Sequence, residues 1–351
     1  MGRWTRWLVA LALLCALVAT PATLADAKKA RAKARSPAAT PAATSSASSA
    51  PPPRSPRDDD PVILKTRGLR NEAMQHSDKR EYDASIEKLR EALTLMHDRV
   101  FGAGREAVKT EERPMDASYY AQLLNDYGGV LIRAEEYDEA IDVLEDAISM
   151  VEKIYGQSHP SFGLSLRSLA DAYFAKKNYD TAIATYKKLR KHMKKGLGAA
   201  HEGYIELHLR IADAYKQLGK RAKAVRALKK VLEEQGGEVN GATKGIGEVY
   251  MELSTLQLKM GELEAAQRTG ETAVAIMRAR DGDESEAHAF SLNALAGVRM
   301  AQKRVEESYR LLQQAHRIAV RVYGKHHAMV KASKRNLDEV KRRLDAAKDE
   351  L

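Results

Sequence analysis

Two short stretches decide the fold: Leu169-Ala170-Asp171-Ala172-Tyr173 and Ile211-Ala212-Asp213-Ala214-Tyr215, which share a pattern and lie 42 residues apart. Further steps of 42 from Ala170 reach small residues in both directions, and a second small residue stands twelve positions after each of them. Recurrence at such a period is typical of repeat proteins built from stacked supersecondary units. The small positions are Gly128, Ala170, Ala212, Ser254 and Ala296, followed by Ala140, Ala182, Ala224, Ala266 and Ser308.

This spacing places the two small residues of each repeat in successive helices, which can then cross closely. An earlier repeat, with Ala73 and Ser85, matches Gly128 and Ala140 at an offset of 55 residues, so a long loop is expected at about 101–114. Each helix hairpin leaves an apolar stripe that a neighbouring hairpin must cover. The pattern therefore predicts an all-α solenoid of about six helix hairpins at 61–328, closed by a polar capping helix at 329–351.

The loops that join the hairpins repeat as well. Gly156, Gly198, Gly282 and Gly324 fall on the 42-residue grid, where a glycine just past a helix end is expected to supply the left-handed residue of a C-cap. A histidine follows three of these glycines, and the repeat after Gly282 has Ser285 instead. One histidine per repeat indicates a loop or capping role. The histidines are His159, His201 and His327.

The chain resembles the tetratricopeptide repeat (TPR) over residues 62–328, and this resemblance implies a right-handed solenoid. The residues that carry this resemblance are Leu169-Ala170-x-x-Tyr173, followed by Tyr179, Ala182 and Tyr186. The 42-residue period and the loop Ile154–Pro160 resemble the kinesin-light-chain subtype, although the long heptad region of that family is missing and its motor–cargo role is not carried over.

The resemblance implies a protein or peptide ligand in a concave groove lined by the first helices of the hairpins. Asparagine and arginine in such a groove can bind a peptide backbone or a carboxylate, and the alternative is an ordinary solvated helix face. Arg70 and Met74 occupy places where some members hold a C-terminal carboxylate, and Met74 argues against that clamp. The predicted groove residues are Asn125, Arg167, Asp171, Arg210, Asp213 and Asn293.

No stretch of the sequence predicts catalysis, a metal site or a cofactor. The glycine pair Gly236 and Gly241 is followed by Ala242-Thr243 and lacks the lysine of a phosphate-binding loop, so no nucleotide is expected. The sequence contains no G-x-S-x-G, H-E-x-x-H or C-x-x-C motif. A binding protein is therefore predicted rather than an enzyme.

The net charge of +10 is concentrated near the N-terminus, since residues 26–57 hold seven Lys/Arg and one Asp. This stretch belongs to a Ser/Pro/Ala-rich segment, 26–60, which is predicted to be a disordered basic tail. The remainder of the chain is nearly balanced in charge, so nucleic acid is not expected as a partner.

The segment 1–25 has the pattern of a secretory signal peptide. Arg3 and Arg6 precede an apolar run, Trp7–Ala19, that is shorter than a membrane-spanning helix, and small residues stand near a cleavage site after Ala25. Cys15, the one cysteine of the chain, would leave with this peptide. The alternative is an uncleaved signal-anchor, because five positive charges follow the run and two precede it; a membrane would then be a partner and the repeats would form a tethered cytosolic scaffold.

The chain ends Lys348-Asp349-Glu350-Leu351, which matches the K-D-E-L signal that retains soluble proteins in the endoplasmic reticulum. With a signal peptide at the other end, this pattern predicts residence in the endoplasmic reticulum lumen and a retention receptor as a partner. The other reading is the end of a helix rich in these four residue types. The function predicted from the sequence is therefore a lumenal, non-enzymatic adaptor or scaffold, for which a link to chaperones is one form.

Overall fold

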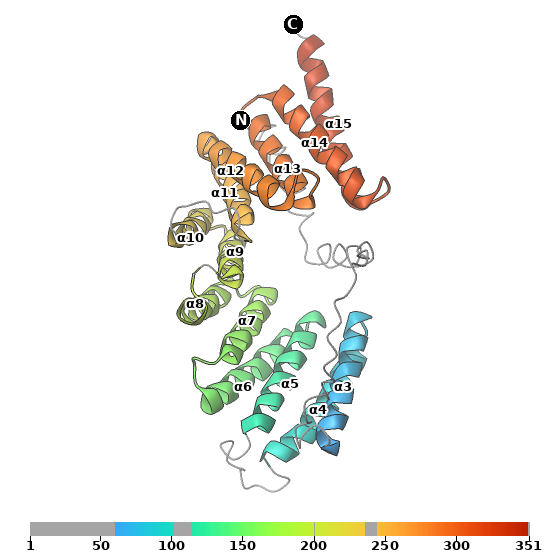
Figure 1. The fold of residues 1–351 in the computed structure, drawn as a ribbon, viewed down its shortest axis with the longest axis vertical. Coiled ribbons are helices and arrows are strands. Elements are labelled where there is room, and N and C mark those ends of the chain that lie inside the picture. Colours follow the sequence, from blue (N-terminus) through green and yellow to red (C-terminus); the bar gives the residue numbers. More distant parts are fainter. Residues whose placement is uncertain (1–59, 102–113, 200, 236–243, 350–351) are drawn as a thin grey trace, which may run out of the picture. The chain divides into compact units, whose positions relative to one another are not determined.

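The structure is a computed structural model that describes residues 60–101, 114–199, 201–235 and 244–349. Thirteen helices and no strand are found in these residues (Figure 1), which confirms the predicted all-α class. In chain order the helices are α3 (Pro61–Asp78), α4 (Tyr82–Phe101), α5 (Pro114–Arg133), α6 (Tyr137–Tyr155), α7 (Pro160–Ala175), α8 (Tyr179–Gly196), α9 (Glu202–Gln217), α10 (Arg221–Glu234), α11 (Ile246–Met260), α12 (Leu263–Asp281), α13 (Glu286–Ala301), α14 (Val305–Tyr323) and α15 (Ala328–Asp349).

The helices follow one another as six helix–turn–helix pairs, beginning with α3 and α4 and ending with α13 and α14. Contacts join the two helices of each pair that lies within one unit, and α15 packs on α14 as the predicted capping helix. The described chain divides into two compact units. The N-terminal unit holds residues 60–224 and the C-terminal unit holds residues 225–349, so that the division falls within α10. In the N-terminal unit each hairpin packs on the next, and α5 also contacts α7. The first helices of these adjacent hairpins therefore lie side by side.

The small residues of the 42-residue grid lie where the two helices of a hairpin touch. Ala170 and Ala182 are fully buried in the hairpin of α7 and α8, and the equivalent alanines and serines of the other hairpins are at most 1% exposed. At Gly128 in α5, an added Cβ would lie 2.6 Å from Cγ of Leu144 in α6. Any larger side chain at these positions would force the two helices apart, as the spacing predicts.

Three hairpins have serine at one of the small positions, and each serine hydroxyl bonds the opposite helix. Ser85 Oγ donates to the carbonyl oxygen of Ala73 at 2.8 Å. Ser254 Oγ donates to that of Ala266 at 2.7 Å and Ser308 Oγ to that of Ala296 at 2.9 Å. Each buried serine hydroxyl is thus hydrogen-bonded, as buried polar groups generally are. Serine is also small enough to let the two helices cross closely.

The turn inside each hairpin contains one residue with a left-handed backbone. Its φ lies between 64° and 82° in all six hairpins. The first two of these residues are 55 apart and the others follow at 42, which confirms the offset predicted for the first repeat. Two are glycines and four carry side chains: the set is Arg80, Glu135, Lys177, Gly219, Gly261 and Lys303.

Replacing Lys177 with glycine should raise the free energy of unfolding by about 0.5 to 1 kcal/mol, because a side chain at positive φ is strained and glycine is not. Lys176, one residue earlier, has an ordinary φ of −66°, so Lys176→Gly should be neutral or destabilising. Urea titration of both variants followed by circular dichroism measures the difference. A Lys177→Gly variant less stable than the parent would contradict this account of the turn.

The glycines after the second helices differ from the predicted C-cap. Gly156, Gly282 and Gly324 have positive φ, at 74°, 90° and 79°, but their ψ values of 171°, 164° and 155° lie far from the left-handed helix. This region is nearly restricted to glycine, so the residue type was predicted correctly and the conformation was not. The chain needs an extended ψ here because it runs on into a short loop before the next hairpin.

The loop histidines begin the next helices. Nδ1 of His159 accepts a hydrogen bond from the backbone N–H of Ser161 at 3.2 Å, and His201 and His327 do the same for Gly203 and Met329 at 3.1 and 3.2 Å. The ring of His159 also stacks on Tyr155, and that of His327 stacks on Tyr323. These bonds satisfy N–H groups that a helix start leaves open. The histidines are therefore N-caps, as the loop pattern predicted.

Candidate functional site

Three of the predicted groove residues surround one buried tyrosine in the N-terminal unit. Tyr186 of α8 is 1% exposed and its hydroxyl donates a hydrogen bond to Oδ1 of Asp171 in α7. Burial raises the pKa of this hydroxyl and the negative charge of Asp171 raises it further, whereas Arg210 and Arg167 act in the opposite direction. Both arginines are thus close enough for their charge to be felt at Tyr186.

The two arginines differ in how they are held. Arg167 Nη2 on α7 lies 2.6 Å from Oε1 of Glu206 on α9, and both side chains are nearly half exposed. Arg210 on α9 is partly buried and forms no hydrogen bond or ion pair with any residue that the structure describes. An arginine carries five N–H donors and stays charged at all ordinary pH values. Arg210 therefore presents donors that the fold leaves for solvent or a ligand.

Asn125 lies deeper than the groove prediction assumed. It is 9% exposed, and its Nδ2 donates to the carbonyl oxygen of Ala121 at 3.0 Å and to Oγ of Ser165 at 2.8 Å. The second bond joins α5 to α7, so Asn125 has a role inside the fold. Its Oδ1 accepts no hydrogen bond among the described residues. Ligand contact by Asn125 stays a prediction.

The remaining two groove residues are not brought to the cluster by a described contact. Asp213 on α9 pairs with Lys216 of the same helix at 3.1 Å. Asn293 lies on α13 in the C-terminal unit, where its Oδ1 accepts a hydrogen bond from Asn336 Nδ2 of α15 at 3.4 Å. The structure thus gathers Arg167, Asp171 and Arg210, and leaves Asp213 and Asn293 with neighbours of their own.

A second polar cluster joins α3 to α5 and was not predicted. Arg70 Nε lies 2.5 Å from Oδ2 of Asp126, with both side chains about a quarter exposed. Tyr119 stands close to Arg70, and burial raises the pKa of its hydroxyl. Arg70 and Met74 occupy the places where some TPR domains hold a C-terminal carboxylate. In the structure Arg70 is engaged by Asp126.

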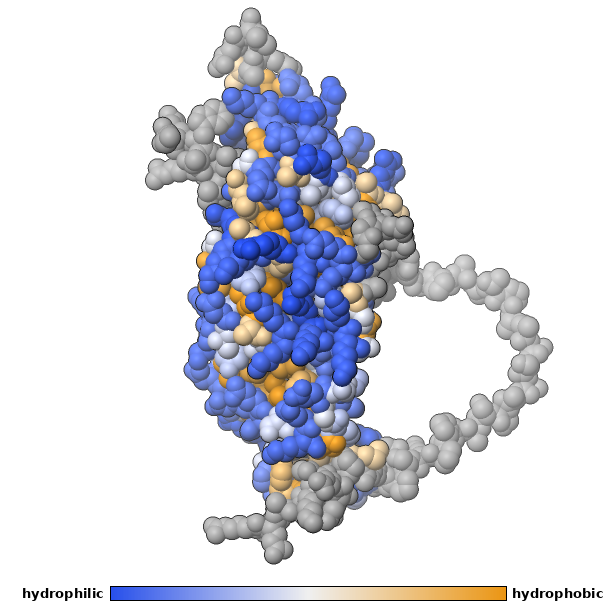
Figure 2. All heavy atoms as spheres, turned by 90° about the vertical axis from the view of Figure 1, so that its left-hand side faces the viewer, coloured by the Kyte–Doolittle hydropathy of each residue, from blue (hydrophilic) through white to orange (hydrophobic). Residues whose placement is uncertain are grey.

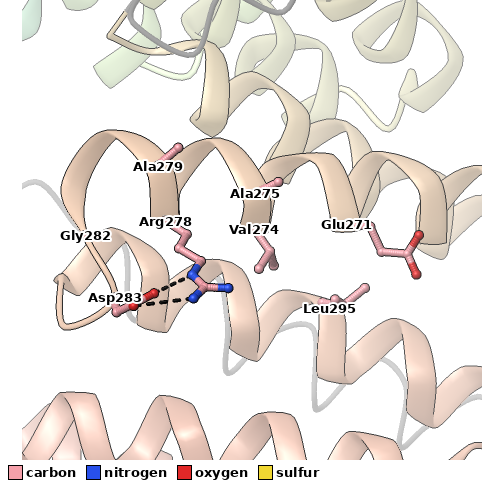
Figure 3. A pocket seen from close by; sticks show the side chains of 8 residues that line it. All are labelled: Glu271, Val274, Ala275, Arg278, Ala279, Gly282, Asp283 and Leu295. Atoms are coloured by element: carbon pink, nitrogen blue, oxygen red, sulfur yellow. Dashed lines mark hydrogen bonds and ion pairs between the residues drawn. The ribbon is translucent and has the colours of Figure 1, made fainter.

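The C-terminal unit contains a depression of about 560 Å³ along α12, shown in Figure 3. Its wall has one ion pair, between Arg278 and Asp283, and a second acid, Glu271; the other lining residues are small or apolar. It holds no group of titratable residues aimed at a common point. The lining residues are Glu271, Val274, Ala275, Arg278, Ala279, Gly282, Asp283 and Leu295.

Within the described ranges, no group of three or more His, Cys, Asp or Glu side chains could hold a metal ion. None of the described helices is both long enough and apolar enough to span a membrane. The glycine pair at 236 and 241, the apolar run 7–19, the tail up to residue 59 and most of the long loop at 101–114 lie outside the described residues.

Comparison with known proteins first shows which class of fold the chain has. The tetratricopeptide repeat family matches residues 119–195, 161–233 and 291–328. The solved structure of a signal-transduction ATPase with a TPR sensor from Pyrococcus horikoshii is similar, with TM-score 0.59, 16% identity, and coverage of 80% of this chain and 39% of that one. BtubC (BKLC) from P. vanneervenii has TM-score 0.54 and 16% identity, with coverage of 77% and 95%. The fold is that of a TPR solenoid.

Two relatives then show to which family the chain belongs. The chain is 54% identical over 301 residues to the RxLR effector protein SFI4 of Phytophthora infestans (strain T30-4), which covers 85% of this chain and 89% of that protein. It is 56% identical over 303 residues to the secreted RxLR effector protein RXLR-C07 of Plasmopara halstedii, with coverage of 85% and 93%. The chain belongs to this family of RxLR effector proteins.

The family overturns the prediction of an endoplasmic reticulum resident. The relatives are effector proteins, and the one from Plasmopara halstedii is named as secreted. Residence in the lumen is therefore wrong, and the retention receptor loses its basis. The match at Lys348–Leu351 is therefore no evidence of retention. Its first two residues end α15, which runs to Asp349, and Glu350 and Leu351 lie outside the described residues.

The letters of the family name point to a pattern that the sequence analysis missed. The chain spells R-x-L-R once, at Arg67-Gly68-Leu69-Arg70. These residues lie within α3, where Leu69 is 6% exposed in the hydrophobic core and Arg70 pairs with Asp126. The four residues were visible in the sequence, but their spacing indicated only one more helical turn of the first repeat. In the folded chain this stretch is part of the first hairpin.

Proposed function

We propose that this protein is a secreted effector that acts by binding a partner protein, without catalysis, and that the first helices of the N-terminal unit hold a peptide segment of that partner. The fold supports a binding role, because repeat solenoids present extended surfaces that accept peptides. The family of secreted effectors supports export, and the segment 1–25 is the signal peptide that we propose for it.

The observation that carries the proposed site is the free set of donors on Arg210 beside the solvent-exposed pair of Arg167 and Glu206. A carboxylate or phosphate on the peptide can bind Arg210 without breaking an internal bond. It can also take the place of Glu206 at Arg167, since an exposed ion pair contributes little stability. Charge-assisted bonds to arginine are about twice as strong as neutral ones. The expected ligand is therefore an acidic peptide segment.

A fluorescence-polarisation screen of acidic, neutral and basic peptides tests this proposal. Acidic peptides should bind best, and Arg167→Glu with Arg210→Glu should weaken their binding at least about tenfold, because two favourable contacts become repulsive. Lys331→Glu with Lys334→Glu on exposed positions of α15 makes the same change in net charge and should leave binding nearly unchanged. Equal losses from both double variants, or no preference for acidic peptides, would disprove the proposed site.

A further inference from the structure

Helix α8 carries a dense group of positive charges on its outer side. Five lysines between residues 187 and 195 are exposed, and the one acid of the helix, Asp180, stands in the first turn and pairs with Lys220. At about 100° per residue the five lysines fall within an arc of roughly 120°. They form a single stripe, which we call the lysine face: Lys187, Lys188, Lys191, Lys194 and Lys195.

The lysine face has few partners within the protein. Lys188, Lys191 and Lys195 form no ion pair or hydrogen bond with any described residue. The ammonium of Lys187 lies 5.7 Å from the ring of Tyr215, which leaves its charge uncompensated by an acid. Like charges on one helix face repel each other and lower helix stability. The stripe therefore has a cost for the fold that an outside partner would offset.

The repeat itself does not require these lysines. Positions 42 residues earlier, on α6, hold Glu145, Asp146 and Glu152 where α8 holds Lys187, Lys188 and Lys194. The two helices occupy the same place in their hairpins and pack equally well with opposite charge. Lys194 and Lys195 complement the negative end of the α8 dipole, but the other three lysines stand before the last turn. Positions 42 residues later, on α10, hold Lys229 and Lys230 where α8 holds Lys187 and Lys188. The fold therefore accepts either charge at these positions and does not itself demand the lysine face.

Leu197 adds an apolar element two residues after the last lysine of the lysine face. It is the C-cap residue of α8 and is 55% exposed. Figure 2 shows the side on which α8 lies in Figure 1 as predominantly hydrophilic, with hydrophobic groups in small separate areas. A cationic stripe that ends in an exposed leucine fits a surface whose negative charges lie above an apolar interior.

We propose that the lysine face and Leu197 form a docking surface for an anionic membrane. Lysine is a compact point charge on a flexible stem, which suits attraction to a plane of lipid headgroups, whereas bidentate recognition of single phosphates favours arginine. No aromatic side chain lies among the exposed residues of α8 to stack on nucleic acid bases. Five lysines close to the surface give a weak, salt-sensitive and reversible attachment, to which insertion of Leu197 adds.

Vesicle sedimentation with the protein in its secreted form tests this surface. The parent should bind phosphatidylcholine vesicles that contain about 30% phosphatidylserine, and added salt should release it. Lys188→Glu, Lys191→Glu and Lys195→Glu together should lower the partition coefficient at least about 100-fold, since each lysine near an anionic surface contributes about fivefold. Leu197→Ser should lower it by about tenfold.

The control variant is Lys331→Glu, Lys334→Glu and Lys341→Glu on exposed positions of α15, which makes the same change in net charge. It should keep most of the binding, and any contribution of the basic stretch 26–57 is shared by all variants. Equal binding to pure phosphatidylcholine vesicles, or equal losses in both triple variants, would overturn the proposal. Tighter, lysine-dependent binding to duplex DNA than to the vesicles would assign the lysine face to nucleic acid and would also overturn it. Circular dichroism of each variant confirms that the helices remain intact.

Discussion

Replacing Arg99 with alanine should lower the free energy of unfolding of the N-terminal unit by about 3 to 5 kcal/mol. Arg99 of α4 bonds two acids at once: its Nε lies 2.9 Å from Oδ2 of Asp116, and its Nη1 lies 2.8 Å from Oδ2 of Asp60. Asp116 is 3% exposed. Removal of the guanidinium would leave a buried carboxylate without its cationic partner, which is among the most destabilising changes that one residue can cause.

Urea denaturation followed by circular dichroism measures this loss. Lys65→Ala is the matched control, because it removes a cation paired with Glu91 on a surface where both side chains are about half exposed. Its expected effect is below about 1 kcal/mol. Asp116→Asn in the Arg99→Ala background should restore part of the stability, since no charge then stays buried. An Arg99→Ala loss as small as that of Lys65→Ala would show that water reaches Asp116 freely.

Gly128→Ala should destabilise the second hairpin by about 1 to 3 kcal/mol, although alanine favours helices more than glycine does. The new methyl group would lie 2.6 Å from Cγ of Leu144, which is fully buried. Leu144→Ala alone should cost about 2 to 5 kcal/mol through the cavity that it opens. In the double variant the methyl group of residue 128 enters that space, so the combined loss should be smaller than the sum of the two.

Gly129→Ala is the control for this cycle. Gly129 is the next residue of α5, and an added Cβ there would meet nothing within 4 Å. The substitution should therefore stabilise the helix by up to about 1 kcal/mol. Urea titrations of the four variants give the coupling energy between positions 128 and 144. Strict additivity, or equal effects at 128 and 129, would mean that close helix crossing is not what demands the small residue.

The repeat grid could be predicted from the sequence because it rests on side-chain volume alone. A residue such as Ala182 is small at the crossing in every hairpin, whatever surrounds it, and the offset of the first repeat follows from the same rule. The backbone at Gly156 could not be predicted in the same way. A glycine permits several positive-φ conformations, and the direction of the following loop selects among them.

The candidate site was harder to predict, since neighbouring helix positions differ by about 100° in direction. Asn125 and Asp126 are adjacent in sequence, yet Asn125 is buried against Ser165 while Asp126 reaches Arg70 on α3. A periodic pattern locates the exposed side of a helix to within about one position, which is too coarse to separate these two roles. Arg167 and Arg210 lie on α7 and α9, the first helices of their hairpins, and their contact with a ligand stays a prediction.

Residence in the endoplasmic reticulum lumen was predicted wrongly for a different reason. A four-residue match at a chain end has little information of its own, and its first two residues, Lys348 and Asp349, are the last residues of α15. The R-x-L-R pattern at Arg67–Arg70 was overlooked, because the helical periodicity of the first repeat already accounted for these residues. Short linear patterns inside regular repeats therefore need evidence from relatives before either reading is preferred.

The caps at the helix starts have a consequence for how the sequence of a repeat can vary. Nδ1 of His159, His201 and His327 accepts a backbone N–H near the start of α7, α9 and α15. The hydroxyl of Ser285, the N-cap of α13, accepts the N–H of His288 in the same way. Such a bond needs only one acceptor atom on a short side chain. A helix start in this solenoid is therefore defined by an acceptor at one position of the 42-residue period rather than by a particular residue type.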